Sequence, residues 1–152
     1  MNARMASAVR RELLGRWEPV YRSRLHYLVT WGTRGRKPVL KDRHIQSIQR
    51  LISQICEERG ISLLDATAGG DHVHVLFSLR PAQSVATAIR ELKSRTAITM
   101  MAQHPELRVW LGAQLLWDDR YSVETLSHGR VQRVQERLRA RHRSIEEMAQ
   151  AS

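Results

Sequence analysis

Residues 61–79 have the sequence ISLLDATAGGDHVHVLFSL and predict a β-hairpin whose turn is Gly69-Gly70-Asp71. Glycine tolerates the positive φ angles that tight turns require. Residues two apart in a strand point to the same face. One face of the second strand is apolar and consists of Val73, Val75 and Phe77. The other face begins with His72 and His74, so the sequence predicts two neighbouring imidazoles on the polar side of a half-buried strand.

The segments around this hairpin give the order β-α-β-β-α-β-α. We expect a strand at 21–31, a helix at 42–59, strands at 61–68 and 72–79, a helix at 85–103, one or two strands within 113–126 and a helix at 130–148. Asp42 and Ser84 are the expected N-caps of the first two helices, and Gly60 ends the first.

This order is the split βαβ pattern of an α+β fold. It predicts a ferredoxin-like or RRM-like antiparallel sheet, with helices on one face and an extra C-terminal helix. The other face would be free for nucleic acid or a second subunit. We expect a basic N-terminal arm at residues 1–19 and one domain at residues 20–150.

The composition points to a polyanionic partner. The formal net charge is +10 and only 5% of the residues are aromatic, so a grip on nucleic acid would depend on charge more than on stacking. A single cysteine, Cys56, excludes a disulfide framework and fits a reducing cytoplasm. Without a signal peptide or a long apolar run, we expect a soluble cytoplasmic protein with no membrane partner.

By itself the pair of histidines is ambiguous. Two imidazoles on one strand face can bind a divalent metal, but such pairs are more often structural. The Gly-Gly-Asp turn just before His72 favours accessible side chains at this position.

Several segments together resemble the single-tyrosine HUH transposases of IS200-like insertion sequences and their repeat-associated relatives. The resemblance covers residues 21 to 142. Its motifs are the run from His26 to Leu40 (HYLVTWGTRGRKPVL), the run from Gly70 to Phe77 (GDHVHVLF), Leu92-Lys93-Ser94, Leu116-Trp117 and Tyr121–Thr125.

The resemblance implies a small ferredoxin-like homodimer that binds imperfect hairpins in single-stranded DNA and cuts and rejoins that DNA. It implies that His72 and His74 hold magnesium or manganese, which polarises the scissile phosphate. A tyrosine on the C-terminal helix would attack to form a phosphotyrosine, and a glutamine one turn later would complete the metal site. In the dimer, that helix is often supplied in trans, and exposed strands would join the subunits.

This chain departs from the family at the nucleophile. The resemblance places the tyrosine position at Arg137 and the glutamine position at Arg141, and the three tyrosines of the chain all precede residue 122. Tyr121 is then the candidate substitute nucleophile, although it also fits a strand aromatic of the family. Ser127 is a poorer candidate because it lacks an evident base. The metal site is expected to be weakened or empty, since two guanidiniums repel a cation but can pair with a phosphate.

Basic residues cluster in two places, at the turn after the first strand and along the last helix. Phosphate contacts of this kind give affinity without sequence choice. A solvated basic surface is the alternative for the helix, and exposed polar residues are the alternative for Lys93 and Ser94. We expect three tryptophans, Trp31, Trp110 and Trp117, in the core or a dimer interface. The candidate nucleic-acid-binding residues are Arg22, Arg24, Arg34, Arg36, Lys37, Lys93, Ser94, Arg130 and Arg133.

Two functions therefore stay open. The first is an active single-stranded DNA transposase that uses the histidines, a divalent metal and a non-standard nucleophile. The second is a domesticated, non-catalytic regulator that binds DNA or RNA hairpins and needs no metal. The missing tyrosine favours impaired or lost cleavage in this copy.

Overall fold

The computed structural model describes residues 24–151, and the side chains of residues 24–141. The predicted arm at 1–19 and the candidate Arg22 lie outside the described residues. The elements are β1 (Leu25–Thr33), a 3-10 turn η2 (Arg34–Arg36), α2 (Asp42–Arg59), β2 (Ser62–Ala68), β3 (His72–Leu79), α3 (Val85–Gln103), α4 (Glu106–Leu111), β4 (Trp117–Leu126) and α5 (His128–Ala151).

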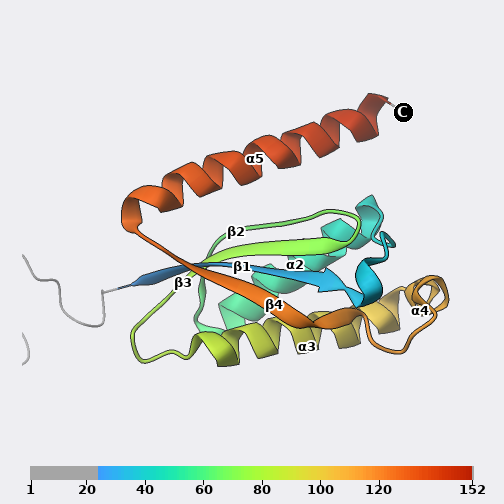
Figure 1. The fold of residues 1–152 in the computed structure, drawn as a ribbon, viewed down its shortest axis with the longest axis horizontal. Coiled ribbons are helices and arrows are strands. Elements are labelled where there is room, and N and C mark those ends of the chain that lie inside the picture. Colours follow the sequence, from blue (N-terminus) through green and yellow to red (C-terminus); the bar gives the residue numbers. More distant parts are fainter. Residues whose placement is uncertain (1–23, 152) are drawn as a thin grey trace, which may run out of the picture.

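The four strands form one antiparallel sheet in the order β2-β3-β1-β4. Helices α2 and α3 cover one face of this sheet (Figure 1). The main core lies between these two helices and the sheet. It includes the predicted apolar face of β3, where Val73, Val75 and Phe77 are fully buried. The predicted α+β, ferredoxin-like fold with an antiparallel sheet and a C-terminal helix is confirmed.

Local signals explain most element ends. Gly60 has φ 65° and its N–H bonds back to the last turn of α2, and the Thr87 N–H donates to the Ser84 hydroxyl at the start of α3. The prediction that Asp42 caps α2 was wrong. Asp42 is the first helical residue, the N-cap is Lys41, and the backbone N–H of Lys41 donates to the ring of His44.

The segment between α3 and β4 differs from the prediction. The prediction assigned no helix or strand to residues 104–112, but helix α4 lies there, with Pro105 as its N-cap and Gly112 at its end with φ 63°. The last strand therefore starts at Trp117 and not at residue 113. The prediction missed a helix of six residues because one and a half turns are too short to show a periodicity.

The expectation that the second face of the sheet is free was also wrong. Helix α5 runs across that face, opposite α2 and α3 (Figure 1). Three of its side chains, Val131, Val134 and Leu138, are buried in a second apolar cluster. The sheet contributes Leu28, Leu64, Leu76 and Leu126 to this cluster. We call the side of the sheet that α5 partly covers the α5 face.

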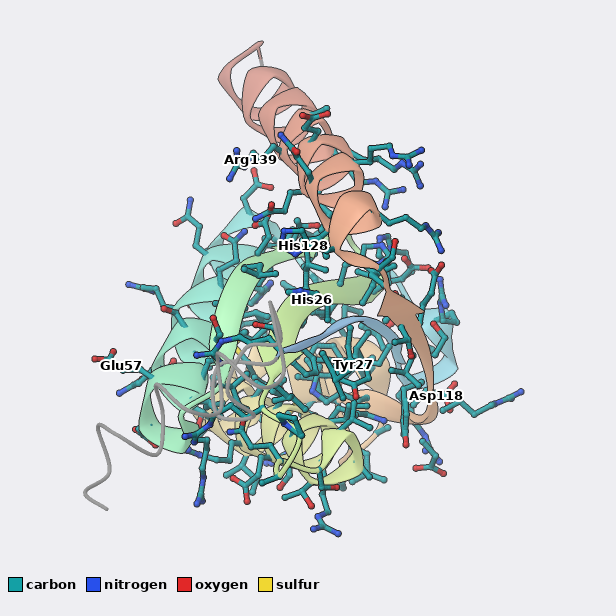
Figure 2. The ribbon with its side chains drawn as sticks, turned by 90° about the vertical axis from the view of Figure 1, so that its left-hand side faces the viewer. His26, Tyr27, Glu57, Asp118, His128 and Arg139 are labelled. Carbon is teal, nitrogen blue, oxygen red and sulfur yellow. The ribbon has the colours of Figure 1, made fainter. Side chains whose placement is uncertain are left out.

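Two histidines lie where the chain passes from β4 into α5. Figure 2 shows His26 of β1 and His128 of α5 between the sheet and the helix, and their ring centroids are 5.7 Å apart. Burial, together with His128 and Arg24, lowers the pKa of His26. The two rings extend the contact between the start of α5 and the sheet.

None of the helices in the described residues is long and apolar enough to span a membrane.

Candidate functional site

His72 and His74, called here the histidine pair, lie on the α5 face at the start of β3. Their ring centroids are 4.8 Å apart, as the two-residue spacing predicts. In β1, Gly32 is opposite His72 and Thr30 is opposite His74. Gly69 makes room for the first ring, because a Cβ there would come within 2.6 Å of the His72 Cε1 atom. The expected positive φ at Gly69 and Gly70 was wrong, because the glycines with positive φ in the described residues are Gly35, Gly60 and Gly112. Gly69 is needed instead for the space that the His72 ring occupies.

A carboxylate orients the first ring. The Nδ1 atom of His72 is 2.7 Å from an Asp71 carboxylate oxygen, which can only accept when ionised. The hydrogen bond from His72, helped by Arg36, lowers the pKa of Asp71. His72 therefore donates through Nδ1, and in the neutral ring the Nε2 atom keeps a free lone pair.

A hydroxyl and a guanidinium orient the second ring. The Nη1 atom of Arg141 is 3.1 Å from the Nε2 atom of His74, and the Nδ1 atom is 2.8 Å from the Thr30 hydroxyl. A guanidinium has no acceptor, so Nε2 must accept and the proton is on Nδ1. Burial first, then the neighbouring His72 and Arg141, lowers the pKa of His74 to about 4. The ring is neutral at physiological pH.

Both rings of the histidine pair therefore carry the Nδ1 proton, which is the tautomer of a histidine that binds a cation through Nε2. A carboxylate and a hydroxyl hold the protonated sides, in the manner of outer-shell groups at metal sites. The cation present is the side chain of Arg141. The hydroxyl of Thr67, opposite His74 on β2, is buried without a hydrogen-bond partner.

Arg141 reaches this position because α5 is packed on the sheet. Val134, Leu138 and Arg141 are spaced four and three residues apart, so they follow one side of the helix. The first two are buried against the sheet, and the third contacts the histidine pair. Arg137, one turn before Arg141, is exposed, and the described contacts give it no partner in the pair.

An open groove of about 450 Å³ lies next to the histidine pair, because Thr30 and Gly32, the ladder partners of His74 and His72, line it. Its floor comes from β1 and β4, and η2 contributes Arg36. The Arg36 guanidinium pairs with Asp71 at 3.3 Å. Sequence reasoning missed Arg120 and Ser122 of this groove, although their alternation with Tyr121 indicated a common face. The lining residues are Thr30, Trp31, Gly32, Arg36, Asp118, Arg120, Tyr121 and Ser122.

Tyr121 does not face the histidine pair. It is opposite Trp31 in the ladder, and Trp31 is opposite Val73, so these three side chains share the face that packs on α3. The ring of Tyr121 lies 5.7 Å from the ammonium group of Lys93 on α3. By this register the side chain of Tyr121 points to the other face of the sheet from the two histidines, which does not favour Tyr121 as a nucleophile acting with them in the same subunit.

The predicted basic residues do not form one surface. Arg36 adjoins the histidine pair, whereas Lys93 and Ser94 lie on α3, beyond the other face of the sheet. Several of these basic side chains already form hydrogen bonds or ion pairs within the chain. Lys37 donates to the Leu111 carbonyl, Lys93 to the Asp118 and Asp119 carbonyls, and Arg34 and Arg130 pair with Asp119 and Glu124. Arg24, Ser94 and Arg133 are exposed.

The tryptophans follow the predicted core positions in part. Trp31 and Trp117 are buried with ring centroids 5.9 Å apart, and the indole N–H of Trp117 donates to the Thr96 hydroxyl. Trp110 on α4 is 42% exposed. It therefore lies outside the core.

A second histidine cluster joins α2 to α4 and was not predicted. One ligand atom from each of His44, His104 and Glu106 lies within 4.8 Å of the others, a spacing that suits a metal. The Lys41 N–H donates to Nδ1 of His44, so Nε2 carries the proton and donates to Glu106 at 2.9 Å. A metal at Nε2 would require the loss of that proton. The cluster is therefore better explained as a hydrogen-bonded anchor of α4.

Comparisons with known proteins agree with this geometry. The family model described as Transposase IS200 like matches residues 21–139. The ISDra2 transposase TnpA of Deinococcus radiodurans is 25% identical over 122 residues, 80% of this chain and 87% of the relative. The transposase for insertion sequence element IS200 of Salmonella typhimurium is 21% identical over 100 residues, 66% of each chain.

Solved structures show the same fold. A protein from Deinococcus radiodurans R1 assigned as a transposase has a TM-score of 0.66 and 25% identity, over 82% of this chain and 95% of that one. A REP-associated tyrosine transposase bound to a REP hairpin has a TM-score of 0.51 and 15% identity, over 74% of this chain and 62% of that one.

Proposed function

The chain belongs to the IS200-like transposase family, and from this premise we propose that it is a cytoplasmic protein that binds hairpin-forming single-stranded DNA without cutting it. The observation that carries the proposal is the contact between Arg141 and His74. A cationic donor lies where a cleaving relative would need a metal, and no tyrosine follows Tyr121 in the sequence.

The chemistry of the family explains what is lost. In the phosphotyrosine step, a tyrosine oxygen attacks the phosphorus atom and the 3′ oxygen of the DNA leaves. The resemblance places Arg137 at the position of that tyrosine. A guanidinium stays protonated at physiological pH and cannot act as the nucleophile. Tyr121 cannot replace it, because it lies on the opposite face of the sheet from the histidine pair.

The metal site is partly retained. His72 and His74 have the tautomer whose Nε2 atom would hold magnesium or manganese. When bound, the metal would polarise a phosphate as a Lewis acid. The remaining neighbour does not fit a metal, because Arg141 has only donors and a positive charge. The proposed function therefore needs no metal.

Binding of hairpins rests on the fold and on charge. The structural neighbour named for a REP hairpin has the same fold, and this chain carries a net charge of +10. Exposed arginines flank the open groove next to the histidine pair. Such contacts recognise the backbone, and hairpin shape would supply the choice of target.

We further propose a homodimer joined through β4. This strand is at the edge of the sheet, and its residues from Asp119 to Thr125 are exposed. Among them Tyr121 and Val123 are 46% and 45% exposed. An exposed edge with apolar side chains is a surface for pairing with another strand. Light scattering after size exclusion should give twice the chain mass, and Val123→Lys should shift it toward the monomer.

The test of non-cleaving binding uses end-labelled single-stranded DNA from a hairpin-forming library, with manganese or with EDTA. Half of each sample runs on a native gel and half on a denaturing gel. We expect a native shift and intact DNA on the denaturing gel. A protein–DNA adduct that survives denaturation would contradict the proposal. Matched RNA hairpins tested in parallel would show whether the target is RNA instead.

A further inference from the structure

We infer that the guanidinium of Arg141 takes the place of a divalent cation at the histidine pair and makes it a metal-independent site for a backbone phosphate of single-stranded DNA. This inference rests on the proposed function, and it names the group that contacts the DNA at the same site. Nothing in the family match assigns a role to an arginine here.

The hydrogen bonds of the histidine pair leave a place for a cation. Asp71 and Thr30 each bind the Nδ1 side of one ring, so both Nε2 lone pairs are left for a cation. Arg141 donates to one of these lone pairs at 3.1 Å. A metal and a guanidinium both need that lone pair, so their binding to His74 is mutually exclusive.

The guanidinium is held in place by more than this contact. Leu138, one turn before Arg141, is 5% exposed against the sheet, and Val134 is 7% exposed. Their burial fixes the helix above the pair. A metal would have to displace Arg141 while the helix stays packed, or else displace the helix. Either change opposes metal binding.

While it contacts His74, the guanidinium can still bind a second group. A guanidinium has five N–H donors in a planar fork, and the contact to His74 uses one of its nitrogens. The remaining fork suits two oxygens of a phosphate. The adjoining groove offers Arg120 and the hydroxyl of Ser122. Arg36, Arg120 and Arg141 carry three positive charges against the two carboxylates of Asp71 and Asp118, so the groove and the histidine pair together keep one net positive charge.

The test compares the wild type with Arg141→Gln, and uses Arg139→Gln as the matched control. Arg139 is an exposed arginine of the same helix, so its replacement removes the same charge without touching the pair. It is labelled in Figure 2, on α5. Circular dichroism confirms that all three proteins are folded.

Metal binding is read without DNA, from the electron paramagnetic resonance signal of free Mn²⁺. We expect no uptake by the wild type or Arg139→Gln. Arg141→Gln should take up Mn²⁺ at one site per chain, and a further His72→Ala change should abolish that uptake. Uptake by the wild type that depends on His72, or no uptake by Arg141→Gln, would overturn the inference.

DNA binding is read by fluorescence anisotropy of a labelled hairpin with single-stranded flanks, in EDTA and in Mn²⁺. The wild type should bind equally in both. Arg141→Gln should bind about tenfold more weakly in EDTA, with the salt dependence of log Kd reduced by about 1, and should regain affinity in Mn²⁺. Equal losses in Arg141→Gln and Arg139→Gln would overturn the phosphate role alone. If none of the proteins binds the hairpin in either buffer, the proposed function and the phosphate-binding role of Arg141 are both refuted. The Mn²⁺ measurement would still test whether Arg141 takes the place of a metal.

Discussion

Packing of α5 on the sheet can be tested by truncating the least exposed of its three buried side chains. Leu138 is 5% exposed and lies in a cluster separate from the main core. Leu138→Ala removes three carbons, which corresponds to about 2.4 kcal/mol at ~0.8 kcal/mol per buried CH₂. Buried Leu→Ala changes cost about 2–5 kcal/mol. We expect about 2.5 kcal/mol, because a helix on the outside of a sheet can settle into part of the space.

The lost packing energy should make it easier for α5 to detach from the sheet, and it should not promote unfolding of the whole domain. A change of about 2.5 kcal/mol increases the population of the open state by roughly 70-fold. Hydrogen exchange of the α5 amides, measured by mass spectrometry, should accelerate accordingly. Exchange in α2 should stay as it is, since α2 packs in the other cluster.

A matched variant separates packing from helix propensity. Gln132 is exposed on the same helix, so Gln132→Ala changes the helix without removing a contact with the sheet. It should leave the exchange of α5 nearly unchanged. If Leu138→Ala accelerates the exchange of α5 no more than Gln132→Ala does, then α5 is not held by this cluster, and the position of Arg141 over the histidine pair loses its explanation.

Three other predictions concern the site and the core. Arg137→Tyr combined with Arg141→Gln should restore Mn²⁺-dependent cleavage of a hairpin DNA that the protein binds. Intact DNA on a denaturing gel would contradict the explanation that only the nucleophile and one metal ligand are lost. Trp117→Phe removes the buried hydrogen bond to Thr96 and should cost about 1–2 kcal/mol in urea unfolding, and a change below ~0.3 kcal/mol would show that bond to be unimportant. A histidine hydrogen bond lowers the pKa of Glu106 from 4.5 to about 2, so its contribution is complete above pH 4.5 and is lost as the pH falls toward 2. The free energy of unfolding of the wild type should therefore fall relative to that of Glu106→Gln across this range, and parallel pH curves would contradict the assignment.

Periodic segments made the fold predictable. Helix α3 was expected at 85–103 and lies at Val85–Gln103, because Ser84 caps it and its apolar residues repeat at helical spacing. Strand β3 was also expected where it occurs, since alternation and the glycine turn fix its register. Helix α4 was missed because its six residues are too few to show a period.

The packing of α5 could not be predicted from its sequence. Its stripe of Val131, Val134 and Leu138 indicated that one side is buried, but not against which surface. The sheet residue that decides this is Leu76, which follows the histidines on the polar face of β3 and is fully buried. A single leucine on a polar face is a weak signal, whereas the structure shows that it forms the base of the second cluster.

The candidate site shows the same division between what spacing determines and what packing determines. The two-residue spacing was enough to place His72 beside His74, because alternation along a strand is a local property. The tautomers of the two rings depend on Asp71 and Thr30, and Thr30 comes from another strand. The contact with Arg141 depends in turn on α5 crossing the sheet. A substitution that looks like simple loss in the sequence is therefore an exchange of one cation for another in the fold. Under the proposed function, His72 and His74 are retained because they hold the guanidinium that contacts the phosphate.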